Sequence, residues 1–233
     1  MSNFPRVVPV GDSGLTVEFG NSIEPRINDR GLAFARAVEK LGLPGVGEVV
    51  PTYRSATVYV DPLLVDTMAM SDRLRSLAET LPKRVTRKAR TIEIPVLYGG
   101  DFGPDLPELA DSSRLPVKEV IRLHASVEYR VYMLGFSPGF PYMGRVPDSI
   151  ATPRLPDPRT KVSAGSVGIA ESQTGIYPQE SPGGWRVIGR TPTRLYDPAR
   201  TSPFLLQAGD HVRFVPITRK VFDHLTHGTN TPH

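Results

Sequence analysis

Residues 158–192 read PRTKVSAGSVGIAESQTGIYPQESPGGWRVIGRTP and indicate most directly how the second half of the chain folds. Short apolar runs alternate there with glycine, proline and serine, a pattern typical of short strands joined by tight turns. The pattern extends beyond this stretch in both directions. A closed or nearly closed β barrel is therefore predicted from the segments 130–136, 165–170, 185–190, 194–196 and 211–215.

The first part of the chain predicts a mixed architecture. Residues 7–19 read as two short strands, and the helix that follows has Asn28 as its candidate N-cap. Two more strands, at 45–51 and 55–60, precede a second helix at about 63–81. The order strand, strand, helix, strand, strand, helix predicts a small α/β sandwich.

At 233 residues the chain is long enough for two modest domains, each with its own apolar core. We expect an α+β protein with an N-terminal α/β domain over residues 1–84 and a β-barrel domain over residues 85–233. The boundary falls in a basic run that reads as a solvated linker and contains Lys83, Arg84, Arg87, Lys88 and Arg90.

Composition narrows the function classes. The 24 prolines and 21 glycines agree with a turn-rich body, and the absence of cysteine excludes disulfides, thiol nucleophiles and cysteine-bound metals. The N-terminal residues carry neither a signal-peptide pattern nor a membrane-spanning run, so we expect a soluble cytoplasmic protein. The net charge of +4 comes without a nucleic-acid-binding motif, and no nucleic-acid partner is expected.

Residues 135–139, Gly-Phe-Ser-Pro-Gly, match the G-x-S-x-G pattern of the nucleophile elbow in serine hydrolases. In that elbow the residue after the serine donates its backbone N–H to the oxyanion, but here it is Pro138, which has no N–H. We therefore interpret the segment as a turn that packs Phe136 and Phe140 against a pocket.

Other motifs are incomplete. The glycine pairs at 45–47 and 165–168 do not complete a phosphate-binding loop, so no self-contained ATP site is predicted. His224 and His227 have a spacing that can place two imidazoles on one helix face, yet no third ligand lies nearby in sequence, and no metal site is expected. His124 lies on the apolar face of a predicted helix, where a lone histidine is usually a structural residue.

The stretch quoted first also carries candidate binding groups. Its glycines allow a ligand to approach the backbone closely, and side chains suited to a small polar or anionic ligand are Lys161, Gln173, Tyr177 and Arg190. The alternative is that these glycines only form tight barrel corners around a packed Trp185. The residue types alone leave both interpretations open.

Three long motifs favour the first interpretation. Residues 98–105 (YGGDFGPD), residues 132–144 (YMLGFSPGFPYMG) and the run 164–192 closely resemble the family of the 5-oxoprolinase B subunit, also known as allophanate hydrolase subunit 1 or as a sporulation-kinase inhibitor. The resemblance spans nearly the whole chain. It implies an N-terminal α/β domain, a C-terminal cyclophilin-like β barrel, and partner subunits A and C.

The resemblance also implies an activity, in which this chain and subunits A and C open the lactam of 5-oxo-L-proline to L-glutamate at the expense of ATP. A lactam carbonyl is a poor electrophile, and phosphorylation of its oxygen would create a leaving group. We expect ATP, with Mg, to be bound by the complex rather than by this chain alone, and the chain to be inactive on its own.

The same resemblance suggests roles for individual residues. Lys161 and Arg190 are the expected catalytic cations, which would stabilise developing charge, and His124 is an acid/base candidate. Family members commonly carry arginine in place of Lys161, which leaves open whether a bidentate contact is required. The expected substrate-binding residues are Phe136, Pro138, Phe140, Tyr142, Ser166, Gln173, Tyr177 and Trp185.

Other functions stay open. Related modules form the carboxyltransferase of urea carboxylase, which would make the chain a carboxyltransferase-like or allophanate hydrolase subunit of urea metabolism, although it has no biotin-attachment Met-Lys-Met motif. The competing class is a regulator that docks on a histidine kinase and inhibits it. Peptidyl-prolyl isomerase activity is not expected, because the Phe-His-Arg signature of true cyclophilins is absent.

Overall fold

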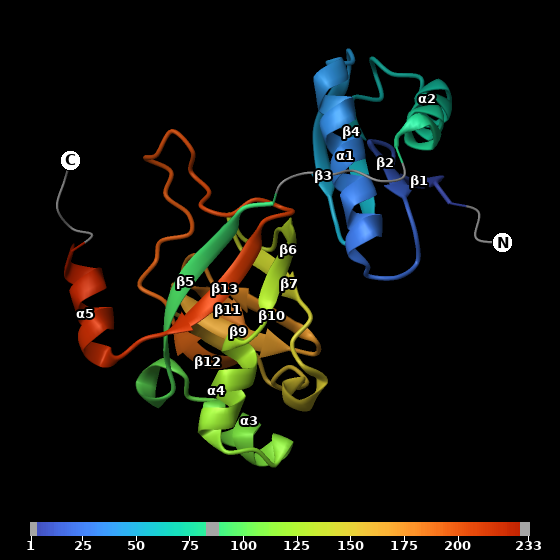
Figure 1. Cartoon of the computed structure of the whole chain (residues 1–233). Helices are drawn as coiled ribbons and strands as arrows, with labels where there is room; N and C mark the ends of the chain where they lie inside the picture. Colours follow the sequence, from blue (N-terminus) through green and yellow to red (C-terminus); the bar gives the residue numbers. More distant parts are fainter. Residues whose placement is uncertain (1–3, 83–88, 229–233) are drawn as a thin grey trace. The chain divides into compact units, whose positions relative to one another are not determined.

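The computed structural model describes residues 4–82 and 89–228, and the chain forms two compact units, residues 1–88 and 89–233 (Figure 1). The predicted boundary after residue 84 and most of the basic run lie outside the described residues. Arg90, at the end of that run, is described and forms an ion pair with the buried carboxylate of Asp210.

The N-terminal unit is a four-stranded antiparallel sheet, in the order β1-β2-β4-β3, with two helices. Leu15 and Val17 of the sheet share one core with Phe34 and Val38 of α1 and with Leu74 of α2. The predicted order of strands and helices is confirmed. The elements are β1 (Arg6–Val10), β2 (Gly14–Glu18), α1 (Pro25–Leu41), β3 (Val46–Pro51), β4 (Ser55–Val60) and α2 (Thr67–Thr80).

The predicted cap of α1 is wrong. The helix begins at Pro25 with Glu24 in the N-cap position, because the fixed φ of proline suits the first helical turn. Asn28 lies buried inside the helix, and its side-chain amide donates a hydrogen bond of 2.9 Å to the carbonyl of Thr52. Asn28 therefore ties α1 to the end of β3 instead of capping the helix.

The C-terminal unit is a closed barrel of seven strands, in the order β10-β7-β6-β13-β5-β12-β9. β5 and β13 pair in parallel and the other neighbours are antiparallel, so the α+β prediction with a closed barrel is confirmed. The strands are β5 (Thr91–Tyr98), β6 (Glu128–Leu134), β7 (Pro141–Gly144), β9 (Ser166–Ala170), β10 (Gln173–Ile176), β12 (Arg186–Arg190) and β13 (His211–Pro216).

Several elements surround the barrel. β8 (Arg159–Val162) and β11 (Ser181–Gly183) pair with each other as a separate two-stranded ribbon. Leu109 and Val120, from the first two helices of this unit, are fully buried in the barrel core. These helices are α3 (Leu106–Ser113) and α4 (Val117–Ala125), followed at the end of the chain by α5 (Arg219–Gly228), and the short 3₁₀ turns are η1 (Gly100–Phe102) and η2 (Asp148–Ile150).

Two details of the barrel unit differ from the sequence pattern. Residues 194–196 form no barrel strand, and pairing there is limited to a bridge between Tyr196 and Phe204. The pattern also does not predict α3 or α5. α5 packs on the barrel unit through Phe222, which is buried with its ring centroid 4.9 Å from that of Phe102, and Arg219 of the same helix lies over the Phe102 ring.

Candidate functional site

Aromatic side chains predicted for substrate binding gather around one hollow of about 240 Å³. The ring centroid of Phe140 lies 5.2 Å from that of Tyr177 and 5.3 Å from that of Trp185. We call this hollow the aromatic pocket. It is lined by Phe136, Phe140, Tyr142, Arg154, Pro158, Tyr177, Pro182, Gly183, Gly184 and Trp185.

Glycine is required where these rings lie against the backbone. A Cβ at Gly175 would lie 2.9 Å from ring atoms of both Phe140 and Trp185, and a Cβ at Gly183 would lie 2.3 Å from the hydroxyl of Tyr177. The glycines of β10 and β11 therefore lie within strands and let the rings pack directly on the backbone, which shapes the pocket. Close packing around Trp185 and a hollow beside it occur together, so neither of the two interpretations that the sequence leaves open is excluded.

The electrostatics of the pocket set its chemistry. Burial raises the pKa of the Tyr142 and Tyr177 phenols, so both are neutral at neutral pH and act as hydrogen-bonding groups. The hydroxyl of Tyr177 is hydrogen-bonded to the backbone of Trp185. The charged residue of the wall is Arg154, whose positive charge acts on both phenols and opposes the effect of burial.

Arg154 makes no ion pair with any carboxylate in the part of the chain that the structure describes. It is exposed and follows Thr152, which bridges to Glu171. The sequence does not single out Arg154, because residues 151–158 carry no motif. The one available signal is an arginine among prolines shortly before the glycine-rich run.

Phe136 lies at the mouth of the pocket in an unusual backbone conformation. Its φ of 67° lies in the left-handed region, which non-glycine residues rarely adopt, and 63% of the residue is exposed. Its ring nevertheless packs edge-on against Phe140, with centroids 5.6 Å apart. The following Ser137 lies in a turn that leads from β6 to β7 and not into a helix, so the nucleophile-elbow geometry is absent at this position.

A second hollow, of about 180 Å³, shares the β8–β11 ribbon with the aromatic pocket. Pro158 lines the first hollow and the next residue, Arg159, lines the second. We call the second hollow the cationic recess. It is lined by Asp101, Phe102, Pro104, Arg159, Lys161, Val162, Ser163, Ser166, Val187 and Arg190.

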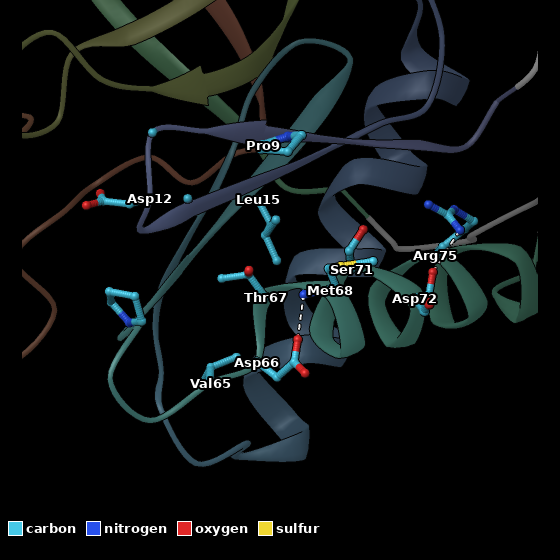
Figure 2. A pocket seen from close by; sticks show the side chains of 13 residues that line it. Pro9, Asp12, Leu15, Val65, Asp66, Thr67, Met68, Ser71, Asp72 and Arg75 are labelled. Atoms are coloured by element: carbon cyan, nitrogen blue, oxygen red, sulfur yellow. Dashed lines mark hydrogen bonds and ion pairs between the residues drawn. The ribbon is translucent and has the colours of Figure 1, made fainter.

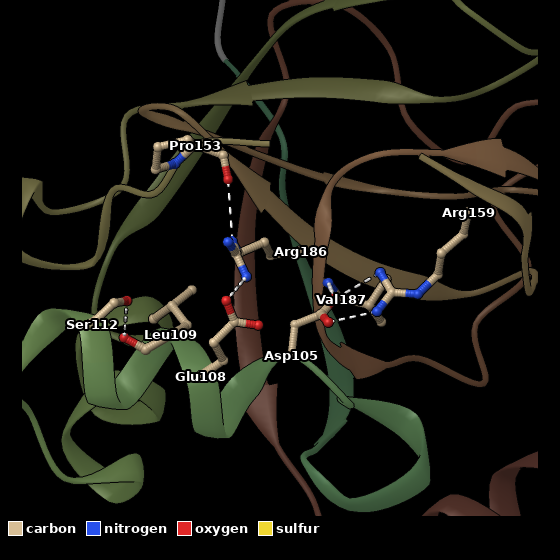
Figure 3. Close-up of polar contacts among 8 residues, drawn as sticks. All are labelled: Asp105, Glu108, Leu109, Ser112, Pro153, Arg159, Arg186 and Val187. Carbon is tan, nitrogen blue, oxygen red and sulfur yellow. Dashed lines mark hydrogen bonds and ion pairs between the residues drawn. The ribbon is translucent and has the colours of Figure 1, made fainter. Parts of the chain in front are cut away.

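Two cations of the recess are already paired. Arg159 donates two hydrogen bonds, of 2.9 and 2.6 Å, to the buried carboxylate of Asp105, which also accepts the backbone N–H of Val187 (Figure 3). The Nζ of Lys161 lies 3.0 Å from the carboxylate of Glu180, and both side chains are more than half exposed. The Arg159 pair is therefore structural, whereas the exposed Lys161 pair is weak and exchangeable.

Figure 3 also shows a third cation with a carboxylate partner. Arg186 of β12 donates to the carbonyl of Pro153, and its guanidinium lies 2.8 Å from the carboxylate of Glu108 on α3. This pair fixes α3 against the barrel next to the segment that leads to Arg154.

Arg190 has no carboxylate partner within residues 4–82 and 89–228. Its Nε donates a hydrogen bond of 2.8 Å to the carbonyl of Ala164, and its guanidinium carbon lies 5.8 Å from the ring centroid of Phe102. The carbonyl and the ring hold the guanidinium in place while leaving its charge unneutralised. The guanidinium of Arg190 is therefore available to bind an anion that enters the recess.

Three other predicted residues lie elsewhere. His124 is fully buried in the barrel core, with Nδ1 2.8 Å from the Tyr98 hydroxyl and Nε2 2.9 Å from the Thr174 hydroxyl. Burial lowers the pKa of His124 to about 3, which keeps the ring neutral. Gln173, on β10, and Pro138, exposed in the turn after β6, are not among the residues that line either hollow.

The N-terminal unit has a larger hollow of about 590 Å³ between the β1–β2 turn and α2 (Figure 2). Two of its carboxylates are already engaged. The carboxylate of Asp66 accepts the backbone N–H groups of Met68 and Ala69, and Asp72 pairs with Arg75. These groups do not converge on a common point, so we place the candidate site in the barrel unit.

Neither a metal-binding cluster nor a membrane-spanning helix occurs within the described ranges. In residues 4–82 and 89–228, no group of three or more histidine, aspartate or glutamate side chains is arranged to hold a metal ion. Within the same ranges no helix combines the length and the apolar composition needed to cross a bilayer.

A family model and a characterised protein both match nearly the whole chain. Residues 5–206 match the family model described as carboxyltransferase domain, subdomain C and D. The chain is 42% identical over 225 residues to the B subunit of 5-oxoprolinase from Bacillus subtilis (strain 168), and the match covers 92% of this chain and 94% of that protein.

Two solved structures with the same fold belong to longer chains. The structure of TTHA0988 has 41% sequence identity and a TM-score of 0.77, and the match covers 88% of this chain but 40% of that one. The urea carboxylase of Kluyveromyces lactis has 22% identity and a TM-score of 0.77, with 93% of this chain and 22% of that chain covered, which supports the fold alone.

Proposed function

Because the chain belongs to the family of the 5-oxoprolinase B subunit, we propose that it is one subunit of an ATP-dependent enzyme that opens 5-oxo-L-proline to L-glutamate. Its proposed partners are the corresponding subunits A and C, and the Bacillus subtilis relative, itself one subunit of a 5-oxoprolinase, supports such an assembly. The structural observation that carries the proposal is the position of the aromatic pocket beside a recess that contains the unneutralised Arg190.

The cationic recess is suited to stabilise developing negative charge. When the lactam bond is attacked, electron density moves onto the carbonyl oxygen, and a fixed cation beside that oxygen lowers the barrier. Arg190 is pre-positioned for this role by Ala164 and Phe102. Lys161 can leave its exposed pair with Glu180 and add a second positive charge.

The residues present fit part of an ATP site. A recess of about 180 Å³ accommodates a phosphoryl group but not a whole nucleotide, and the described residues offer no carboxylate cluster for Mg. When bound, ATP supplies the phosphoryl group that turns the lactam oxygen into a leaving group. We therefore propose that the nucleotide and its metal are held mainly by the partner subunits.

A reconstituted assembly tests this function. The chain is mixed with its A and C counterparts, and 5-oxoproline-dependent release of phosphate is measured together with glutamate formation. Both products are expected in equal amounts from the complete set, with none from this chain alone. The proposal fails if the complete set releases no phosphate in response to 5-oxoproline, and tight binding to a histidine kinase would then favour the regulatory function.

A carboxyltransferase-like role is the second candidate, because the matching family model is that of a carboxyltransferase domain. The same reconstituted set separates the two. A carboxyltransferase would transfer a carboxyl group from a carboxylated biotin carrier to urea, and 5-oxoproline would have no effect on that transfer.

A further inference from the structure

We propose that the aromatic pocket binds the ring of a small cyclic carboxylic acid and that Arg154 binds its carboxylate. The proposal rests on the proposed function for the identity of the probe, 5-oxo-L-proline. It adds a carboxylate-binding residue to that function and assigns a different role to each of the two hollows. The aromatic pocket would select the ligand, and the cationic recess would carry the charge that develops during reaction.

The size and lining of the pocket suit a single small ring. Its volume of about 240 Å³ lies below the roughly 300–1,000 Å³ typical of sites for drug-sized ligands. The walls present ring faces and edges from Phe140, Tyr177 and Trp185, and the rings of Tyr177 and Trp185 each meet that of Phe140 nearly at right angles. A compact ring with apolar methylene groups fills such a space without burying an unpaired charge.

The charge of the pocket favours a ligand with an anionic group. Arg159 has Asp105 as its partner and Lys161 has Glu180, whereas Arg154 has no carboxylate partner in the described part of the chain. Its guanidinium offers a planar fork that matches a carboxylate in two parallel hydrogen bonds. The neutral hydroxyls of Tyr142 and Tyr177 lie within the electrostatic reach of the same guanidinium and can donate to the same anion.

Phe136 completes the enclosure of the ligand. Its left-handed backbone directs an exposed ring toward Phe140 and Tyr177, with centroids 5.6 and 6.5 Å away. An exposed aromatic ring in a costly conformation is explained if it covers a bound ring, because the contact then offsets part of the conformational cost.

The single tryptophan of the chain provides the test, because Trp185 lies in the pocket wall. Tryptophan emission of the full chain is followed during titration with 5-oxo-L-proline and, separately, with 2-pyrrolidinone, which has the same ring without the carboxylate. Arg154→Gln is expected to weaken 5-oxo-L-proline binding by about 10- to 100-fold, the loss of one charge-assisted interaction. It should leave the weak binding of 2-pyrrolidinone unchanged.

Two further variants sharpen the result. Arg145→Gln removes another exposed arginine, paired with Asp148 outside the pocket, and should bind 5-oxo-L-proline like the wild type. Arg154→Lys keeps the charge but loses the fork, and an intermediate affinity is expected. In the reconstituted assembly, Arg154→Gln should raise KM and leave kcat nearly unchanged.

The inference is overturned by either of two results. One is a wild-type chain whose tryptophan emission shows no saturable response to 5-oxo-L-proline, and the other is an Arg154→Gln chain that binds it as tightly as the wild type. If the assembly still turns over 5-oxo-L-proline in either case, the proposed function stands and only the ligand-binding role of Arg154 is lost. Binding without any turnover would instead refute the proposed function.

Discussion

The buried imidazole of His124 predicts that the barrel loses stability in mild acid. The hydroxyl of Thr174 donates its hydrogen to the carbonyl of Gly168 over 3.0 Å, so it accepts a hydrogen bond from Nε2 of His124. The other ring nitrogen, Nδ1, then accepts the hydroxyl hydrogen of Tyr98. This arrangement uses the neutral ring, and a second proton, on Nδ1, would remove the acceptor of the Tyr98 hydroxyl hydrogen.

The magnitude follows from the pKa of His124, which burial lowers from 6.5 to about 3. Between these values the unfolded chain binds a proton that the folded chain does not. The stabilising contribution of His124 is therefore complete above about pH 6.5 and is lost as the pH falls toward about 3. At about 1.4 kcal/mol per pH unit, the loss between pH 6.5 and 4.5 is about 3 kcal/mol.

A non-titrating variant isolates this contribution from that of the carboxylates. His124→Gln keeps one donor and one acceptor, so it should be less stable than the wild type at pH 7.5, by about 1–3 kcal/mol, because its packing is poorer. The difference should shrink by about 3 kcal/mol at pH 4.5. Urea unfolding followed by Trp185 emission reports on the barrel unit, and His224→Gln, an exposed position on α5, serves as the control. Parallel stability curves for the wild type and His124→Gln between pH 7.5 and 4.5 would refute the reasoning.

Three more outcomes are expected. Lys161→Ala should lower turnover of the assembly without changing the melting temperature, and unchanged kinetics would remove Lys161 from the site. Arg190→Lys should lower kcat/KM by about 10- to 100-fold, because lysine lacks the planar guanidinium that Ala164 and Phe102 hold in place. Arg194→Lys, which lies outside the recess, should have little effect, and equal rates for both variants would contradict this role. Gly183→Ala should destabilise the barrel by about 1–3 kcal/mol and shift the tryptophan emission, because its Cβ would lie 2.3 Å from a phenol oxygen, while Gly184→Ala, whose Cβ meets its nearest atom at 3.5 Å, should be tolerated in thermal unfolding.

Local patterns in the sequence are sufficient to predict much of the fold. Alternating apolar residues indicate β2 and β4, and glycine-rich turns mark β9 and β12, because strand periodicity and turn chemistry are local properties. The N-cap of α1 and the helix α5 depend instead on distant partners. Asn28 is held by Thr52, and Phe222 by Phe102, and neither partner is visible from the neighbouring sequence.

In the candidate site, too, some residues can be predicted from the local sequence and others depend on distant partners. The aromatic residues Phe136, Phe140 and Tyr142 are predictable, because the turn that they flank has too many glycines and prolines to continue a helix or a long strand. The position of His124 cannot be decided from the sequence, because a histidine on an apolar helix face can point into a pocket or into a core, and this depends on distant residues such as Tyr98 and Thr174.

Arg154 could not be identified from the sequence for a more general reason. The chain contains 28 lysines and arginines against 24 aspartates and glutamates, so most positive charges can find a partner, and residue type does not reveal which ones do. Tertiary pairing assigns Asp105 to Arg159 and Glu180 to Lys161. The anion-binding capacity of this surface therefore depends on the positions of its carboxylates, and introducing one beside Arg154 should abolish ligand binding as effectively as removing the arginine.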